Sequence, residues 1–431
     1  MKRTTTRAGF DPESSTSTPK RTKLTKKEEK LLRSIPQKPK KEGPAPAPAP
    51  STKKTTSRRS QTTMEGYLPA KAKAEDKSSA AATDAPLGPP KLFTRELQKV
   101  LKKEGAVIIP KVVDEETCAE LFEEMRTYYQ TWMEAVKDNL SGADPNVEKK
   151  LNLDDTKTWL SSWRPFGPHG LVQFDGHQSF CWKLRQHPRV AQVFADFYGV
   201  KPEDLLVSFD GWRCILKGTK YQQDKKWAHV DQSPNARPPC TIIQASVTLQ
   251  DSDADGDGDF VYWKRSNLIY DRYFELHPQD DGKVDNFVKW DEGFIQEMET
   301  SGQMERVRIK RKAGDMVVWY STTLHQSDTP KHDAQEHDAA VLFVSMAPRK
   351  HATQKDMDAR LKAFKEKRTT SHWPIYCVKQ FPKTPHLRGS LVAKVYFSGR
   401  ERTSEANEGK PDFVENGGVI TPLGRRLIGF F

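Results

Sequence analysis

Apolar residues follow no regular pattern over the first 90 positions, and beyond them they recur with helical spacing. Leu97, Val100 and Leu101 would share one helix face, and Gly105 is placed to end that helix. A longer helix is predicted after Asp114, which is suited to cap it. Its apolar side would carry Leu121, Phe122, Met125, Tyr129 and Trp132.

Short strand-like runs dominate from about residue 205 onwards, and turns rich in Gly, Pro and Asp separate them. Helices followed by many short strands predict a mainly β fold, an antiparallel sandwich or barrel with helical cladding. The predicted strands are Ala106–Val113, Leu205–Phe209, Trp212–Leu216, Thr241–Leu249, Phe260–Trp263, Val307–Lys310, Met316–Tyr320 and Ala339–Met346.

Charge and proline distribution divide the 431-residue chain into a basic tail and a nearly neutral body. Residues 1–90 hold 20 of the 70 Lys and Arg, 9 of the 58 Asp and Glu, 12 of the 29 prolines and none of the ten tryptophans. Such a segment buries too little apolar surface to offset its chain entropy, so residues 1–90 are predicted to be a disordered tail. The near balance of charge in the body excludes a uniformly basic nucleic-acid-binding domain.

Two other classes of protein are disfavoured. No apolar run reaches the roughly 18 residues of a membrane helix, and Met1-Lys2-Arg3 leads into threonines, so we expect neither a membrane span nor a secretory signal. The five cysteines are widely spaced without a C-x-x-C pair, which favours a reducing compartment over a disulfide framework or a cysteine-based zinc site.

Two short stretches of the tail indicate where the protein acts. Lys20-Arg21-Thr22-Lys23 has the spacing of a nuclear-import signal, which predicts a nuclear location and otherwise a cytoplasmic one. Gln61, Met64, Tyr67 and Leu68, flanked by basic residues, resemble the box with which proteins bind the DNA sliding clamp. Leu68 departs from that pattern, because the last position is usually aromatic. The resemblance implies a clamp as partner, with Met64, Tyr67 and Leu68 as an apolar plug.

The candidate chemistry lies in the body. His229 and Asp231 are two apart, so on a strand both side chains project to one face and reach one ion. His325, after the Gly314-Asp315 turn and an apolar strand, offers a third ligand. Two imidazoles and one carboxylate leave open coordination positions, which suits Fe(II) that binds a bidentate cosubstrate and O2.

Residues 91–349 resemble the phytanoyl-CoA dioxygenase-like branch of the 2-oxoglutarate/Fe(II) dioxygenases. Four stretches carry the resemblance: Gly105–Pro110, His229–Gln232, Thr248–Trp263 and Gly314–His325. It implies a double-stranded β-helix (jelly-roll or cupin-like) core, His229, Asp231 and His325 as iron ligands, and Fe(II), 2-oxoglutarate and O2 as the reactants that hydroxylate a C–H bond. Residues 350–431 would then be an α-rich extension packed on that core.

One feature of the family is missing. An arginine about ten residues after the distal histidine grips the tail carboxylate of 2-oxoglutarate, but Gln335 and Glu336 stand there. Arg349 is the nearest later arginine and is our candidate for cofactor binding. Lys225, Lys226 and His337 are the alternatives.

Two further segments have competing interpretations. Asp251–Gly256 begins like an EF-hand calcium loop, but Tyr262 stands where the twelfth residue should be Glu, so an acidic hairpin turn is the better interpretation. The basic residues and aromatic cluster of 350–431 could bind single-stranded nucleic acid, although a solvated face above a core is more common.

Three functions remain open from the sequence. The first is a nuclear dioxygenase recruited to the sliding clamp, with a DNA- or chromatin-associated substrate or a small molecule. The second is a non-catalytic clamp-binding adaptor that retains a dioxygenase-like scaffold. The third is nucleic-acid binding through the basic tail, which would be weak and salt-sensitive.

Overall fold

The computed structural model describes residues 91–141, 170–173, 175–218, 226–258, 260–279, 282, 284–381 and 418–430, with the side chains of 132–141 left aside. The predicted tail, with its import signal and Gln61–Leu68, lies outside the described residues. Among the described helices, none combines the length and apolar character needed to cross a membrane.

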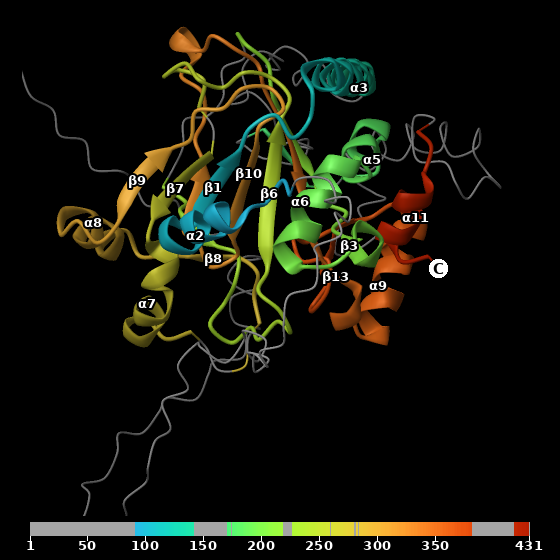
Figure 1. Cartoon of the computed structure of the whole chain (residues 1–431). Helices are drawn as coiled ribbons and strands as arrows, with labels where there is room; N and C mark the ends of the chain where they lie inside the picture. Colours follow the sequence, from blue (N-terminus) through green and yellow to red (C-terminus); the bar gives the residue numbers. More distant parts are fainter. Residues whose placement is uncertain are drawn as a thin grey trace, which may run out of the picture. The chain divides into compact units, whose positions relative to one another are not determined.

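Short strands and helices alternate along the described chain (Figure 1). The strands are β1 (Ala106–Ile109), β2 (Leu171–Val172), β3 (Leu205–Val207), β4 (Trp212–Ile215), β5 (His229–Val230), β6 (Ile243–Thr248), β7 (Phe260–Lys264), β8 (Val288–Lys289), β9 (Glu305–Arg308), β10 (Met316–Tyr320), β11 (His325–Ser327), β12 (Ala339–Val344), β13 (Met346–Pro348), β14 (Thr369–Thr370) and β15 (Gln380–Phe381). The α-helices are α2 (Arg95–Glu104), α3 (Glu115–Ser141), α5 (Ser179–Arg185), α6 (Pro188–Tyr198), α7 (Tyr270–Leu276), α8 (Glu292–Thr300), α9 (Gln354–Lys365) and α11 (Pro422–Ile428).

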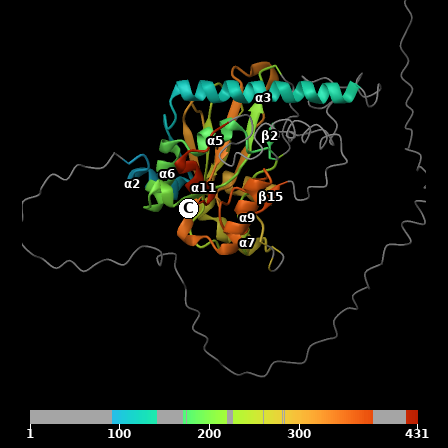
Figure 2. The same ribbon diagram turned by 90° about the vertical axis from the view of Figure 1, so that its right-hand side faces the viewer.

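The two predicted N-terminal helices are confirmed, and their ends follow from local chemistry. Thr94 caps α2 by accepting a hydrogen bond from the backbone of Leu97, and Gly105 ends the helix in the left-handed conformation at φ 90°. Asp114 accepts a hydrogen bond from the Thr117 backbone at the start of α3. Figure 2 shows α3 as the longest of the drawn helices.

Two antiparallel sheets form the centre of the fold. The larger has the strand order β1-β10-β6-β12-β4-β2, and the smaller β8-β5-β11-β7-β9. Neighbouring strands are mostly far apart in sequence, so each sheet is completed only after residues beyond 300 have been added. The mixed fold with antiparallel sheets agrees with the mainly β prediction with helical cladding.

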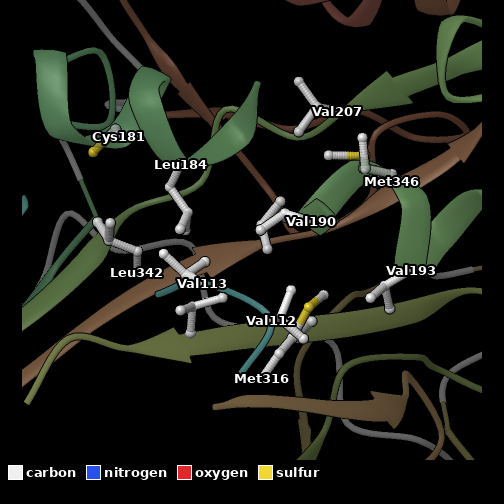
Figure 3. Packing of buried hydrophobic residues seen from close by; sticks show 14 of the residues in the cluster. Val112, Val113, Cys181, Leu184, Val190, Val193, Val207, Met316, Leu342 and Met346 are labelled. Carbon is white, nitrogen blue, oxygen red and sulfur yellow. The ribbon is translucent and has the colours of Figure 1, made fainter. Parts of the chain in front are cut away.

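The larger sheet has one face toward helices and one toward the smaller sheet. Alternate residues Ile243, Ala245 and Val247 of β6 belong to the main apolar cluster with α3, α5 and α6. Figure 3 shows part of this packing, with Val190 of α6 beside Leu342 and Met346 of the strands. On the opposite face, a smaller cluster joins β1 and β10 to β7 through Ala106, Val317, Trp319, Phe260 and Tyr262.

The segment beyond residue 350 packs on the same core. α9 and α11 contribute Ala363, Phe364, Leu427 and Ile428 to the main apolar cluster. Figure 1 shows α5, α6, α9 and α11 on one side of the sheets, and α7 and α8 on the other. The predicted boundary at residue 349, between the dioxygenase-like domain and the C-terminal extension, stays a prediction.

Candidate metal centre and adjoining pocket

Two neighbouring strands of the smaller sheet bring two imidazoles together. β5 pairs with β11 so that His229 stands directly opposite His325, and their ring centroids are 4.4 Å apart. Asp231 follows β5, and its carboxylate oxygens lie 3.5 Å from His229 Nε2 and 3.3 Å from His325 Nε2. All three side chains are buried, with ligand atoms within 4.8 Å of one another. The structure thus assembles the three predicted metal ligands.

Backbone carbonyls hold both histidines in the tautomer that suits a metal. Nδ1 of His229 lies 3.0 Å from the carbonyl oxygen of Trp227, and Nδ1 of His325 lies 2.9 Å from that of Thr323. A carbonyl oxygen only accepts, so Nδ1 is the donor and the lone pair of Nε2 faces Asp231. Burial, together with nearby His325, lowers the pKa of His229 to about 3, which keeps the ring neutral as a ligand must be.

The carboxylate of Asp231 is the least compensated group of the cluster. Both its oxygens are buried, and neither accepts a hydrogen bond. Burial opposes its ionisation, but the neighbouring His372 and His325 outweigh it and hold the pKa below its ordinary value. A buried anion without donors is costly. The donor set of one carboxylate and two Nε2 lone pairs therefore fits a divalent cation.

Aromatic rings surround the two histidines and restrict their orientation. Trp227 stacks on His229 with centroids 4.9 Å apart, and Phe287 lies 4.5 Å from the same ring. Phe260 and Trp319 each lie 5.5 Å from the ring of His325. These rings exclude water from most of the imidazole surface and fix the direction of each Nε2.

A pocket of about 260 Å³ opens beside Asp231. His372 is one of its lining residues: its Nδ1 lies 2.6 Å from Asp210 Oδ2, and its Nε2 lies 3.9 Å from Asp231 Oδ2. Burial opposes protonation of His372, but Asp210 and Asp231 raise its pKa to about 10. The described lining residues are Gln173, Asp210, Asp231, Asn286, Phe287, Thr370, Ser371, His372 and Phe381.

Arg349 is not brought to the triad. It follows β13, which pairs with β3 rather than with either strand of the histidine pair, and its guanidinium donates to the backbone carbonyl of Arg426 in α11. It does not belong to the described lining of the pocket. Its position therefore does not support the predicted grip on a cosubstrate carboxylate.

Two of the alternatives to Arg349 are paired with acidic residues outside the triad. Lys226 pairs with Glu292 at 3.1 Å, and His337 pairs with Asp257 at 2.8 Å. Lys225 lies outside the described residues.

The acidic loop that resembles an EF-hand is held by lysines. Lys312 Nζ lies 2.8 Å from Asp251 and 2.7 Å from Asp253, while Lys310 pairs with Asp255 at 2.8 Å. With their carboxylates paired to two different lysines, these residues form an acidic turn, as the sequence favoured.

Sequence reasoning missed four polar residues near the centre. Asp210 and His372 are separated by 162 positions, and no local pattern links them. Gln244, in contrast, had a detectable signal. Within the run Thr241–Leu249, the polar residues Gln244, Ser246 and Thr248 alternate with apolar ones, which marks a strand face that avoids the main apolar core.

Individual relatives are distant. Ava biosynthesis cluster protein O of Aspergillus versicolor is 25% identical over 243 residues, which cover 54% of this chain and 76% of that protein. A putative oxidoreductase from Salmonella typhimurium LT2 has a TM-score of 0.47 at 13% identity, covering 78% of this chain and 83% of that one. HygX from Streptomyces hygroscopicus, solved with nickel and 2-oxoglutarate, has a TM-score of 0.34 at 14% identity, covering 60% and 88%.

A family model matches the chain as well. The family model for phytanoyl-CoA dioxygenase (PhyH) matches residues 101–332, more than half of the chain. The matched range contains His229, Asp231 and His325. The chain belongs to the phytanoyl-CoA dioxygenase (PhyH) family.

Proposed function

We propose that this protein is an Fe(II)- and 2-oxoglutarate-dependent dioxygenase that hydroxylates a C–H bond. The observation that carries the proposal is the carboxylate of Asp231, which is buried, ionised and without a hydrogen-bond donor between two histidine Nε2 atoms. Two imidazoles and one carboxylate suit Fe(II), whereas thiolates favour other metals. All three residues lie within the family match.

The strand order supports a double-stranded β-helix as the scaffold. β10-β6-β12-β4 of the larger sheet face β5-β11-β7-β9 of the smaller one. The two sets alternate along the chain from β4 to β12, except that β7 and β9 follow each other within the smaller sheet. Such winding places β5 and β11 side by side although 96 positions separate His229 from His325. In this scaffold the metal ligands lie on rigid strands rather than on loops.

The residues of this chain have separable tasks in the reaction. Asp231 and the two Nε2 atoms would hold the metal, and the backbone carbonyls of Trp227 and Thr323 keep the imidazoles in the required tautomer. Bound iron, with 2-oxoglutarate and O2, supplies the oxidation of the C–H bond, while 2-oxoglutarate is converted to succinate and CO2. Trp227 and Phe287 shield His229 from water.

The pocket beside Asp231 is the proposed substrate site. Seven of the nine described lining residues are polar, and the other two are Phe287 and Phe381. No lysine or arginine occurs in that described lining, which disfavours recognition of a phosphate group at this point. These properties favour a compact, hydrogen-bonding small molecule, or a part of a larger substrate with the same character, over a long acyl chain.

Anaerobic spectroscopy of the purified full chain tests the metal and the cosubstrate. Titration with Fe(II) and then 2-oxoglutarate is expected to give a visible charge-transfer band, and succinate is expected on admission of air. His229→Ala should abolish the band, whereas the control His351→Ala, in the turn after β13, should retain it. Failure of the wild-type protein to bind Fe(II) or 2-oxoglutarate by calorimetry would favour the non-catalytic scaffold.

Recruitment to the sliding clamp is a second, separate proposal that rests on the sequence alone. Gln61, Met64, Tyr67 and Leu68 supply the motif, and a tether would raise the local concentration of the enzyme near DNA-bound substrates. Tyr67→Ala should abolish binding to purified clamp by calorimetry, with Thr62→Ala as the matched control. Equal binding by both variants would exclude this motif. The nuclear location is tested by replacing Lys20, Arg21 and Lys23 in a fluorescent fusion.

A further inference from the structure

Two buried polar side chains beside the metal centre have no hydrogen-bond partner. The amide of Gln244 is 2% exposed, and neither its nitrogen nor its oxygen is bonded; the indole Nε1 of Trp319, 3% exposed, is likewise unbonded. The two residues stand directly opposite each other on β6 and β10. Buried polar groups are usually hydrogen-bonded in native proteins, so an adjacent unbonded pair beside the proposed metal centre is a candidate ligand site.

Both groups face the interior between the two sheets. Ile243 and Ala245, on either side of Gln244, belong to the helix-facing apolar cluster, so Gln244 projects to the other face. Trp319 belongs to the cluster between the sheets, with its ring 4.5 Å from that of Phe260 and 5.5 Å from that of His325. The unbonded donors therefore lie next to a proposed metal ligand.

A buried cation lies on the same strand face. Arg311 is 1% exposed, and its Nη1 donates to Ser246 Oγ at 2.9 Å. Ser246 is two positions from Gln244, so the two side chains share one face of β6. An amide N–H, an indole N–H and a nearby guanidinium together match a carboxylate, because its oxygens accept several hydrogen bonds and its charge needs compensation.

We propose that Gln244 and Trp319, with Arg311 beside them, bind the tail carboxylate of 2-oxoglutarate. This inference rests on the proposed function. In the family, an arginine about ten residues after the distal histidine binds this carboxylate, but Gln335 and Glu336 stand at that spacing here. The proposal gives this role to residues of β6 and β10 instead. Direct bonds come from the amide and the indole, and Arg311 supplies charge compensation.

Comparing the binding of two 2-oxo acids measures the contribution of the tail carboxylate to affinity. The Fe(II)-loaded full chain is titrated anaerobically with 2-oxoglutarate and, separately, with pyruvate, which has the 2-oxo acid group but no second carboxylate. Gln244→Leu removes the amide, and Trp319→Phe removes the indole N–H while an aromatic ring remains. Each variant is expected to weaken 2-oxoglutarate binding about tenfold, equivalent to about 1.4 kcal/mol, and to change pyruvate affinity less than twofold.

A matched control separates this effect from a general loss of packing. Gln326→Leu replaces a buried glutamine whose amide is already bonded to Asp328 at 2.7 Å. It should leave 2-oxoglutarate affinity unchanged and lower the urea midpoint of the metal-free protein. Gln244→Leu should leave that midpoint unchanged or raise it, because it removes a buried amide that has no partner.

The outcomes distinguish the inference from the proposed function. Wild-type affinity for 2-oxoglutarate in both Gln244→Leu and Trp319→Phe would overturn the inference alone. An equal loss of affinity for 2-oxoglutarate and for pyruvate would also overturn it, because Gln244 and Trp319 would then affect the metal or the fold rather than the tail carboxylate. Absence of Fe(II) binding by the wild-type chain would instead defeat the proposed function.

Discussion

Gly314, in the turn that leads into β10, is predicted to tolerate no side chain. Its φ is +86°, and a Cβ built there would lie 2.0 Å from the carbonyl oxygen of Val113. The carbonyl of Gly314 in turn accepts hydrogen bonds from the backbones of Val112 and Val113, at 2.9 and 3.2 Å. Gly314→Ala must therefore strain the backbone and separate the turn from the segment after β1.

The expected cost follows from these contacts. A left-handed conformation costs a non-glycine residue about 1–2 kcal/mol, and each lost backbone hydrogen bond about 0.5–1.5 kcal/mol. Gly314→Ala should therefore lower the free energy of unfolding by about 3 kcal/mol. Gly199 is the matched control, because its φ is +65° and nothing lies within 4 Å of its added Cβ. Gly199→Ala should cost about 1–2 kcal/mol.

Urea unfolding of the metal-free protein, followed by circular dichroism and tryptophan fluorescence, measures both variants. The slope of the transition should be unchanged, so that the midpoints report stability. A Gly314→Ala midpoint equal to or above that of Gly199→Ala would refute the reasoning, because the contact with Val113 would then cost nothing.

Three further predictions concern the site and its supports. Co(II) at a hundredfold excess over its Kd should stabilise the wild-type chain by about 2.7 kcal/mol and Asp231→Ala not at all, as measured by urea unfolding; equal stabilisation would place the ion elsewhere. The hydrogen bond to Asp257 raises the pKa of His337, so this pair should stabilise the protein below the ordinary histidine pKa and lose that effect as pH rises through the raised value. His337→Gln should reduce the pH dependence of the free energy of unfolding, measured by urea titration at several pH values, by less than about 1 kcal/mol. An unchanged pH profile would contradict the assignment. Arg360→Met should cost about 1–3 kcal/mol and increase proteolysis near residues 369–381, because the carbonyls of Pro374, Leu427 and Ile428 lose the buried guanidinium that donates to them; a fully protected segment would contradict this.

Much of the β framework could be predicted because its strands are long enough to show a pattern. Met316–Tyr320 was predicted with the bounds of β10, and the run Thr241–Leu249 contains β6 with one or two extra residues at each end. β5 and β11 have only two and three residues, so period-two alternation could not reveal them. They are defined by their pairing with each other rather than by their own sequences.

The site was predictable where its residues carried a local signal. His229 and Asp231 stood two apart, and His325 followed a recognisable strand, whereas Arg349 was chosen by distance along the chain. β12 and β13 are separated by one residue, yet β13 leaves the larger sheet to pair with β3, which moves Arg349 away. His372 depends on a long-range bond to Asp210, which a single sequence does not encode in any spacing.

The pocket wall at 369–381 lies beyond the range matched by the family model, and it has a consequence for protein synthesis. During translation, the proposed metal ligands His229, Asp231 and His325 leave the ribosome well before this wall does. Arg360 then links the turn at Pro374 to the end of α11, so the wall is secured only when residue 428 has emerged. The residues of the proposed metal centre are therefore synthesised first, and the wall of the proposed substrate pocket is completed last.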